Sequence, residues 1–491
     1  MGNSACIMIE IENNGSCCGG AKLKGNVLLD VRKATSADIL FFHFSGYENT
    51  KIDQGESGFS YGSECIYSTQ VILRRYHGGS VPRGRYVFPF EVVLPRGLPR
   101  SQRSNESCSI AYHCLATLHR SGAPKWIVKN SCEVLMNDEP YAPFPTPMFL
   151  GPTSSKVFSM IGSPSGVITF GGRVNTTSVC ANEKLRVDYG ICNQSTARVK
   201  ALTIVLMRHI TFKTTATSNS MSHEVFKKRV EAANLVGAEP GDVAVDADYD
   251  AILKQINDPE FGVDIPINSD ALSSYSGPLI SVTYWLILSM KTTFGTKNAT
   301  IWIPIIVHGR GLRFAGADPK APLRRAMPAD WIEIEMQTTV SLREPSLHLA
   351  EGYDTVDRLN VIVKKSKEWQ KVTVLKDWLA HSPHNINLLT PDTMPPLFQC
   401  IESNSNITFH MFCQTLGMAM NDIKSTNKCT TAHIAAAARA LPPGTTDQQG
   451  TAQLVCCLFA PHCTDRANAL KTFKTIGLTD IQRDSVMLHY I

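Results

Sequence analysis

Residues 84–101 read Gly84-Arg-Tyr-Val-Phe-Pro-Phe-Glu-Val-Val-Leu-Pro-Arg-Gly-Leu-Pro-Arg-Ser101, a run of strand-forming residues with a proline inside it. Valine, tyrosine and phenylalanine favour strands, whereas Pro89 has no N–H to donate to a neighbouring strand. The run therefore predicts a strand at the edge of a sheet or a bulged strand. Such an edge is where a β-sandwich is open to partners.

The sequence around this strand, residues 22–139, predicts an antiparallel β-sandwich. Short β-rich runs are punctuated there by Gly, Pro, Asn and Ser, and helix signals are scarce. Apolar residues recur at every second position, at Val27, Leu29 and Val31 and again over residues 110–118. This period places one face of each strand inward.

A proline-rich segment at residues 140–152 separates this region from a second β-rich region, since it can neither form a helix nor lie in a sheet centre. We predict a first domain at residues 1–147 and a second at 148–310. The second domain carries a polar insertion at 218–272, in which apolar residues at 224–235 and 249–256 have helical spacing. Its strands are predicted at 166–174, 185–192, 199–212, 279–290 and 299–307.

After residue 310 the pattern changes to helices. We predict a linker at residues 311–364, which begins rich in Pro, Arg and Ala, and a small all-α domain of five or six helices at 365–491. Leu375, Trp378 and Leu379 fall at helical spacing, and Thr390 before Pro391 is typical of a helix start. Further helices are predicted at 407–420, 431–441 and 452–459, and after a capping box that begins at Thr479.

Composition excludes several classes of protein. The formal net charge of the 491 residues is +5 with no long Lys/Arg block, so nucleic acid is not a predicted partner. The N-terminus lacks the basic start and apolar core of a signal peptide, and we therefore expect the 15 cysteines to be reduced. The longest apolar stretch, residues 280–290, is too short to cross a bilayer as a helix.

No motif for catalysis is found. The sequence lacks G-x-S-x-G, a P-loop, H-E-x-x-H and G-x-G-x-x-G after a strand, so neither an enzyme nor a cofactor is predicted. The C-terminal region holds cysteines and histidines that are either zinc ligands or small buried helix residues, and their spacing favours burial with no metal. These residues are Cys400, His410, Cys413, Cys429, His433, Cys456, Cys457, His462 and Cys463.

The 84–101 run, followed by Ser109-Ile-Ala-Tyr112, resembles the signature of the arrestin N-terminal domain, especially in the α-arrestins. Upstream, Gly25-Asn-Val-Leu-Leu29 and Phe44-Ser-Gly-Tyr-Glu-Asn-Thr50 occupy the order of that family's early strands and its G-x-E-x-T segment. Pro278-Leu-Ile-Ser-Val-Thr-Tyr284 and Ile303-Pro-Ile-Ile306 resemble the C-terminal arrestin domain. The resemblance covers roughly residues 7–310. It implies two immunoglobulin-type β-sandwiches in tandem, followed here by the all-α domain.

The resemblance also implies a function, that of a non-enzymatic adaptor for endocytosis, sorting and protein transport. Expected partners are cytosolic tails of membrane receptors or transporters and trafficking or ubiquitination machinery, with the protein cytoplasmic and peripheral to plasma membrane or endosomes. Direct ubiquitin-ligase recruitment is put in doubt, because Pro395-Pro-Leu-Phe398 and Pro442-Pro-Gly-Thr445 lack the family's tyrosine. The alternatives are a signalling scaffold that assembles soluble cytosolic enzymes, and an undetected enzymatic or metal-binding function in residues 370–491.

Four cations are candidates for binding phosphate or an acidic membrane surface, namely Lys22, Lys24, Arg74 and Arg75. Their other interpretation is a solvated strand end. Gly2 opens the pattern for N-myristoylation, and Cys6 replaces its usual Ser or Thr but offers a thiol for palmitoylation. Because one myristoyl chain binds membranes only marginally, stable anchoring is expected to need both Gly2 and Cys6.

Overall fold

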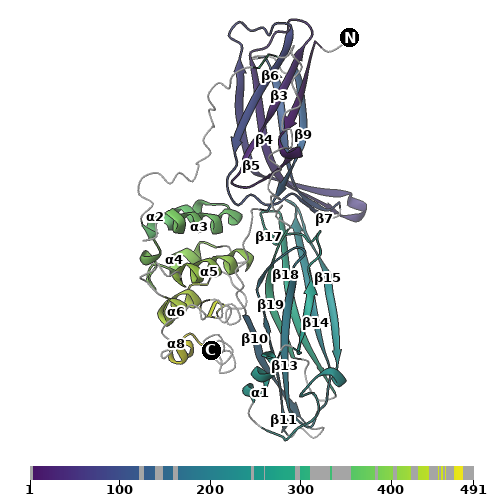
Figure 1. The fold of residues 1–491 in the computed structure, drawn as a ribbon, viewed down its shortest axis with the longest axis vertical. Coiled ribbons are helices and arrows are strands. Elements are labelled where there is room, and N and C mark those ends of the chain that lie inside the picture. Colours follow the sequence, from purple (N-terminus) through teal and green to yellow (C-terminus); the bar gives the residue numbers. More distant parts are fainter. Residues whose placement is uncertain are drawn as a thin grey trace.

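The computed structural model describes residues 4–104, 106–120, 127–138, 148–158, 164–244, 248–258, 260–293, 299–309, 332–333, 355–381, 385–401, 406–421, 429–441, 452, 455, 456, 459 and 469–478. In these residues two β-sandwiches follow each other end to end, and the helices α2 to α8 are stacked along one flank (Figure 1). We call the three parts the N-terminal sandwich, the C-terminal sandwich and the helical part. The predicted fold class is confirmed.

The N-terminal sandwich consists of one sheet in the order β1-β3-β6-β20 and another in the order β2-β9-β8-β4-β5, with β7 paired to β8. Its core is built by the residues that alternate along the strands, and Phe42 stacks on Phe90 with ring centroids 3.9 Å apart. The strands are β1 (Ala5–Ile11), β2 (Ser16–Cys18), β3 (Lys22–Val31), β4 (Ile39–Asp53), β5 (Phe59–Arg75), β6 (Gly84–Val93), β7 (Gln102–Ser104), β8 (Cys108–His119), β9 (Val128–Asn137) and β20 (Ile332–Glu333).

The expected alternation and edge are both present. Val27, Leu29 and Val31 are buried against the core, as are the even-numbered residues of β8. Pro89 lies opposite Asn26 of β3, and β20 pairs with β6 only at residues 86–87. Among the described residues, β6 therefore has a free edge at Pro89, where the missing N–H costs no ladder hydrogen bond.

The C-terminal sandwich has sheets in the orders β10-β11-β13-β16 and β12-β19-β18-β14-β15, with β17 paired to β18. All five strands predicted for this region are confirmed. The strands are β10 (Met148–Phe158), β11 (Pro164–Val174), β12 (Ser178–Cys180), β13 (Lys184–Ser195), β14 (Val199–Lys213), β15 (Ser218–Glu231), β16 (Gly262–Pro266), β17 (Tyr275–Ser276), β18 (Ile280–Thr292) and β19 (Ala299–His308).

The insertion predicted at 218–272 is partly wrong. Residues 224–231 belong to the long strand β15, and the helical structure within 224–235 is confined to a single 3-10 turn at Ala232–Asn234. A tight turn closes the β14–β15 hairpin, in which Thr214 N donates to Thr217 O at 2.7 Å, and the pairing then runs from Lys213–Ser218 to Ala201–Glu231. This cross-strand pairing outweighs local apolar spacing. The second predicted helix is confirmed as α1 (Tyr249–Ile256), capped by Asp248.

The helical part begins earlier than residue 365, and the predicted linker at 311–364 is wrong at two places. Helix α2 starts at Val356 because Thr355 caps it and because Val356, Leu359 and Val363 bury one face. Strand β20 lies in the same predicted linker. The helices are α2 (Val356–Lys365), α3 (Lys371–His381), α4 (Pro395–Gln399), α5 (Asn406–Asn421), α6 (Thr431–Arg439) and α8 (Ala469–Thr475).

The remaining helix predictions have mixed outcomes. Helices at 407–420 and 431–441 are confirmed, and residues 452, 455, 456 and 459 are helical. The helix start predicted at Thr390 and Pro391 is wrong: Thr390 and Thr393 exchange hydrogen bonds of 2.8 Å and 3.3 Å that close a single turn, and α4 starts only at Pro395. The capping box at Thr479 lies outside the described residues.

Candidate functional site

Strand β4 carries the G-x-E-x-T segment to the junction of the two sandwiches. Gly46, Glu48 and Thr50 alternate along β4 and therefore share its inward face. A side chain at Gly46 would overlap the ring of Tyr112, which is fully buried and donates its hydroxyl to Pro99 O at 2.7 Å. The segment thus needs glycine at its first position for a packing reason.

Glu48 joins the two sandwiches through its carboxylate. Oε2 accepts hydrogen bonds from the backbone amides of Leu279 at 2.8 Å and Ile280 at 2.9 Å, and Oε1 accepts one from the Tyr275 hydroxyl. The side chain is fully buried, and burial raises the pKa of Glu48 although these three hydrogen bonds oppose the rise. No ion pair with Glu48 occurs in the described part of the chain.

Thr50 and Ser60 fix the base of the β4–β5 hairpin to the C-terminal sandwich. Thr50 Oγ1 donates to Lys213 O at 2.7 Å, and Ser60 Oγ hydrogen-bonds Thr214 Oγ1 at 2.8 Å. Glu48 and Thr50, two residues apart on β4, therefore both bind the C-terminal sandwich.

Ser273 forms a second link between the sandwiches. Its hydroxyl donates to Asp138 Oδ2 at 2.6 Å and accepts from Gly309 N at 2.9 Å, while its own N–H donates to Gln102 Oε1 at 3.2 Å. A Cβ on Gly309 would lie 2.6 Å from Asp138 Oδ2 and 2.7 Å from Ser273 Oγ. A larger residue at this position, just after β19 ends, would have to displace the side chains that form the link.

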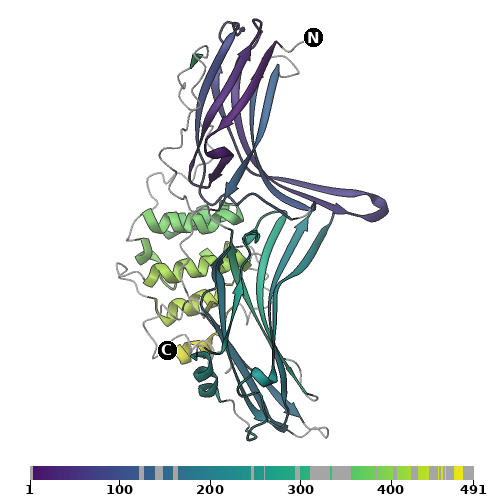
Figure 2. The ribbon, with the colours of Figure 1, turned by 45° about the vertical axis from the view of Figure 1, so that its right-hand side comes forward.

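The tip of the β4–β5 hairpin is exposed and aromatic. The hairpin projects sideways at the junction of the sandwiches (Figure 2). Phe59 is 51% exposed and Tyr61 is 65% exposed, and Lys51 Nζ lies 4.0 Å from the centroid of the Phe59 ring. The tip thus offers apolar surface and a cation together, a combination that suits contact with another molecule.

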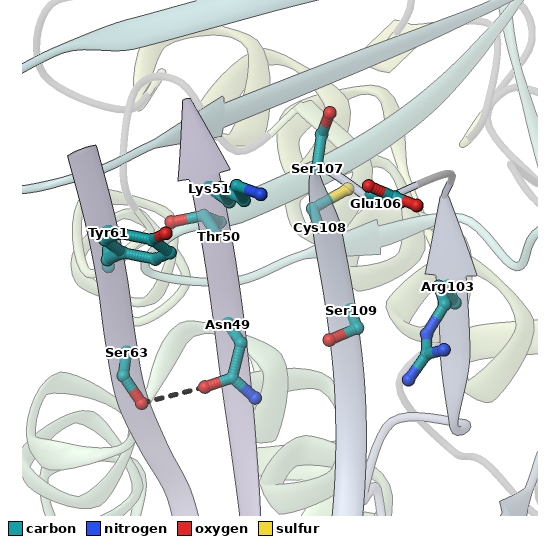
Figure 3. Close-up of a pocket in the computed structure, with 11 residues that line it drawn as sticks. Asn49, Thr50, Lys51, Tyr61, Ser63, Arg103, Glu106, Ser107, Cys108 and Ser109 are labelled. Carbon is teal, nitrogen blue, oxygen red and sulfur yellow. Dashed lines mark hydrogen bonds between the residues drawn. The ribbon is translucent and has the colours of Figure 1, made fainter. Parts of the chain in front are cut away.

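A shallow pocket of about 410 Å³ runs along this hairpin. Its side chains come from β5, β4, β8, β7 and the turn between β7 and β8, and they include Tyr61, Lys51, Arg103 and Glu106 (Figure 3). Asn49 accepts a hydrogen bond from Ser63 at 2.9 Å. Asn49 and Lys51 alternate with Glu48 and Thr50, so their side chains point to the face of β4 away from the buried junction. The pocket offers polar groups of both signs.

The helical part contacts the N-terminal sandwich through side chains. Lys367 Nζ donates to two backbone oxygens of β5, Cys65 O at 2.9 Å and Ile66 O at 2.8 Å. Arg96 Nη1 forms an exposed ion pair with Asp377 Oδ1 at 2.9 Å.

Helix α5 contacts the C-terminal sandwich. His410 Nε2 hydrogen-bonds Thr177 Oγ1 at 3.4 Å, and burial lowers the pKa of His410 to about 4. Burial, helped by nearby Lys376, also lowers the pKa of His308 to about 4. Both imidazoles are therefore neutral near pH 7 and serve as packed hydrogen-bonding groups. The helical part lies across both sandwiches.

A second pocket of about 410 Å³ lies where the three parts meet. Glu64 contributes from the N-terminal sandwich, Lys213 and Ser276 from the C-terminal sandwich, and Lys367 and Glu368 from the helical part. Leu279 and Ile280, which donate to Glu48, line it too. This pocket therefore borders the residues of the C-terminal sandwich that bind Glu48.

The four predicted anion-binding cations are not brought together. Lys22 and Lys24 both pair with Glu91, at 2.6 Å and 3.2 Å, and they hold the pKa of Glu91 below its usual value. Arg74 and Arg75 end β5, at the opposite end of the sandwich, where β6 begins after the next loop. Each pair is a separate feature, and the single carboxylate of Glu91 offsets only one of the two positive charges of the first pair.

Of the two predicted lipidation residues, the structure describes only Cys6. Gly2 lies outside the described residues. Cys6 is exposed on β1, whereas Cys17 and Cys18 are buried on β2 and cannot accept an acyl chain without opening the sheet.

Of the described cysteines and histidines that were candidate zinc ligands in the helical part, all but the half-buried Cys400 pack as core residues. Among the described residues no group of three or more His, Cys, Asp or Glu side chains is placed to hold a metal ion. Cys413, Cys429 and Cys456 are buried, and His433 Nδ1 accepts the amide of Thr430 as part of a helix cap. Cys457, His462 and Cys463 lie outside the described positions.

Reasoning from the sequence missed Glu48, Tyr275 and Lys367. The G-x-E-x-T segment is itself a signal, since a glutamate in an otherwise inward-facing series needs buried partners. No sequence pattern near Glu48 identifies Tyr275 as its partner, and no pattern near Lys367 predicts its contact with β5.

Comparisons with known proteins agree with this architecture. The profile of the arrestin (or S-antigen) N-terminal domain matches residues 7–137, and that of the arrestin (or S-antigen) C-terminal domain matches residues 164–310. No curated protein matches the chain. Among the described residues no helix is both long enough and apolar enough to cross a membrane.

Proposed function

Because this chain belongs to the arrestin family, we propose that it is a non-enzymatic adaptor that binds cytosolic tails of membrane receptors or transporters and links them to trafficking machinery. The family assignment supports an adaptor role in trafficking or signalling. The choice of trafficking, of membrane cargo and of a cytoplasmic location peripheral to membranes is our proposal.

The observation that carries the proposal is the exposed tip of the β4–β5 hairpin. Phe59, Tyr61 and Lys51 stand beside a polar pocket, and the base of the same hairpin is tied to the C-terminal sandwich. Tyrosine is among the residues enriched in binding hot spots, and exposed aromatic surface suits contact with a partner. A cargo tail held there would also sense how the two sandwiches are placed.

We assign recruitment of effectors to the helical part and membrane attachment to Gly2 and Cys6. The exposed Cys6 thiol supports the second assignment. Comparing alkynyl fatty-acid labelling of the wild type with Gly2→Ala and Cys6→Ser tests it. Unchanged labelling and membrane fractionation of Gly2→Ala would exclude N-terminal anchoring.

Proximity labelling in the native cell tests the adaptor role. Wild-type neighbours should include membrane receptors or transporters and coat proteins, and imaging should show cargo-dependent movement to plasma membrane or endosomes. Neighbours restricted to soluble enzymes, with no such movement, would instead establish a signalling scaffold.

A matched pair of variants makes the test specific to the hairpin. Phe59→Ser with Tyr61→Ser should remove the cargo neighbours. Trp302→Ser is the control, because Trp302 is 59% exposed on β19, away from the hairpin. Equal losses in both variants, or no loss in the hairpin variant, would reject the hairpin as the cargo contact.

A further inference from the structure

Two cysteines face each other inside the N-terminal sandwich. Cys114 on β8 and Cys132 on β9 are direct cross-strand partners in the antiparallel ladder. Directly opposite residues hold their Cβ atoms about 4.5–5.5 Å apart, slightly more than the spacing in a disulfide, so a small closure of the strands suffices. The two thiols lie close enough for each to shift the pKa of the other.

The pair is asymmetric in a way that suits stepwise oxidation. Cys114 is fully buried, whereas Cys132 is partly exposed near the sheet edge. The interaction between the two thiols lowers the pKa of Cys132 and, together with burial, raises the pKa of Cys114. Cys132 is thus the accessible thiol with more thiolate character, and Cys114 is the protonated thiol behind it.

We propose that Cys114 and Cys132 form a modification site at which a hydroperoxide produces a reversible disulfide. The Cys132 thiolate attacks one oxygen of hydrogen peroxide, the O–O bond breaks, and the departing hydroxide takes up a proton as water. Cys132 becomes a sulfenic acid. The Cys114 sulfur then attacks the Cys132 sulfur, the S–O bond breaks, and water leaves with the Cys114 proton. Two thiols and one peroxide give one disulfide and two waters.

The site has a structural consequence because of where β9 leads. Five residues after Cys132, Asn137 donates to Ser16 Oγ at 2.6 Å, and Asp138 follows with its bond to Ser273 of the C-terminal sandwich. A disulfide between β8 and β9 would fasten the strand that leads into the second link between the sandwiches. Thiol reductants would release it.

The test is oxidation of the full-length protein with about one equivalent of hydrogen peroxide, the stoichiometry of a single disulfide, followed by alkylation and mass spectrometry. Trypsin leaves Cys114 on peptide 104–120 and Cys132 on peptide 130–156, so a cross-link between these peptides should appear and disappear with reductant. Peptide 104–120 also contains Cys108, so the experiment is repeated in Cys108→Ser, where the cross-link should persist.

Single variants separate the two steps. Cys132→Ser should abolish the cross-link and leave Cys114 reduced, whereas Cys114→Ser should leave Cys132 as a sulfenic acid that dimedone traps. Cys6→Ser is the control, since Cys6 is exposed on β1 and should not affect the cross-link. Each variant is first checked for a wild-type thermal transition. The proposal fails if folded wild type shows no 104–120 to 130–156 cross-link while Cys6 is oxidised, or if the cross-link requires Cys108.

Discussion

Glu48 and Glu368 are both buried where parts of the molecule meet, but they are held in different ways. Glu48 receives three neutral donors from the other sandwich, two of them backbone amides. Glu368 pairs with buried Lys371 of its own helical part, and its Oε1 has no hydrogen-bond partner in the described structure. The backbone amides that hold Glu48 cannot move away without opening a strand. The helical part is instead held to the N-terminal sandwich by the side chains of Lys367 and Arg96, which can change rotamer. We therefore expect the contact between the two sandwiches to be harder to open than the contact between the helical part and the N-terminal sandwich.

Glu48→Ala is the most severe way to test this order. It would leave the Tyr275 hydroxyl and the amides of Leu279 and Ile280 without an acceptor, and each orphaned donor costs about 1–3 kcal/mol. We expect the free energy of unfolding to fall by about 3 kcal/mol or more, measured by urea denaturation. Glu56→Ala, at the exposed hairpin tip, is the control. A loss no larger than that of the control would show that the junction does not depend on Glu48.

Lys367→Met tests the softer contact. It removes both hydrogen bonds to β5, and because the side chain is largely exposed we expect a loss of only about 1–2 kcal/mol. Hydrogen exchange should rise in α3 and leave the sandwiches unchanged. Lys365→Met is the matched control, since Lys365 is an exposed lysine at the end of α2. Faster exchange across β4 and β18 would mean that the helices and the sandwich junction open together.

Arg96→Ala should have a smaller effect. The Arg96–Asp377 pair is exposed, and exposed pairs contribute about 1 kcal/mol or less, which salt reduces further. The difference in melting temperature between wild type and Arg96→Ala should shrink as salt is raised. A difference that is large and insensitive to salt would indicate that Arg96 acts through packing.

The smallest expected change is a trend with pH. Burial raises the pKa of Glu48 above its usual value near 4.5, so the folded protein binds this proton more tightly than the unfolded chain. Stability from this group is present at low pH and is lost as pH rises through the folded pKa. Relative to Glu48→Gln, which cannot titrate, the wild type should therefore gain melting temperature as the pH is lowered towards 4.5. A difference that stays constant with pH would contradict the raised pKa.

Local patterns predicted those parts of the fold that depend on local chemistry. The period of two at Val27, Leu29 and Val31 and the proline at Pro89 each identified a strand and its position. Residues 224–231 carry no comparable local signal. The turn at Thr214 and the pairing with β14 decide that they form a strand and not a helix.

The candidate site was harder to predict because its partners are distant in the sequence. Glu48 meets Tyr275 and Ile280 only after both sandwiches have folded. Lys367 reaches Cys65 and Ile66 across most of the chain. Conversely, Arg74 and Lys22 are similar in the sequence, yet the path of β3 and β5 places them at opposite ends of one sandwich.

The β4–β5 hairpin also has a mechanical meaning. Its base is pinned at Thr50, and Gly55 at the tip is five residues further on, which at about 3.3 Å per residue makes an arm of roughly 16 Å. A force applied to Phe59 or Tyr61 therefore reaches Glu48 as a torque. A molecule bound to the hairpin tip can therefore strain the contact at Glu48 without touching it. The stiffness of the hairpin determines how much of the applied force is transmitted to Glu48.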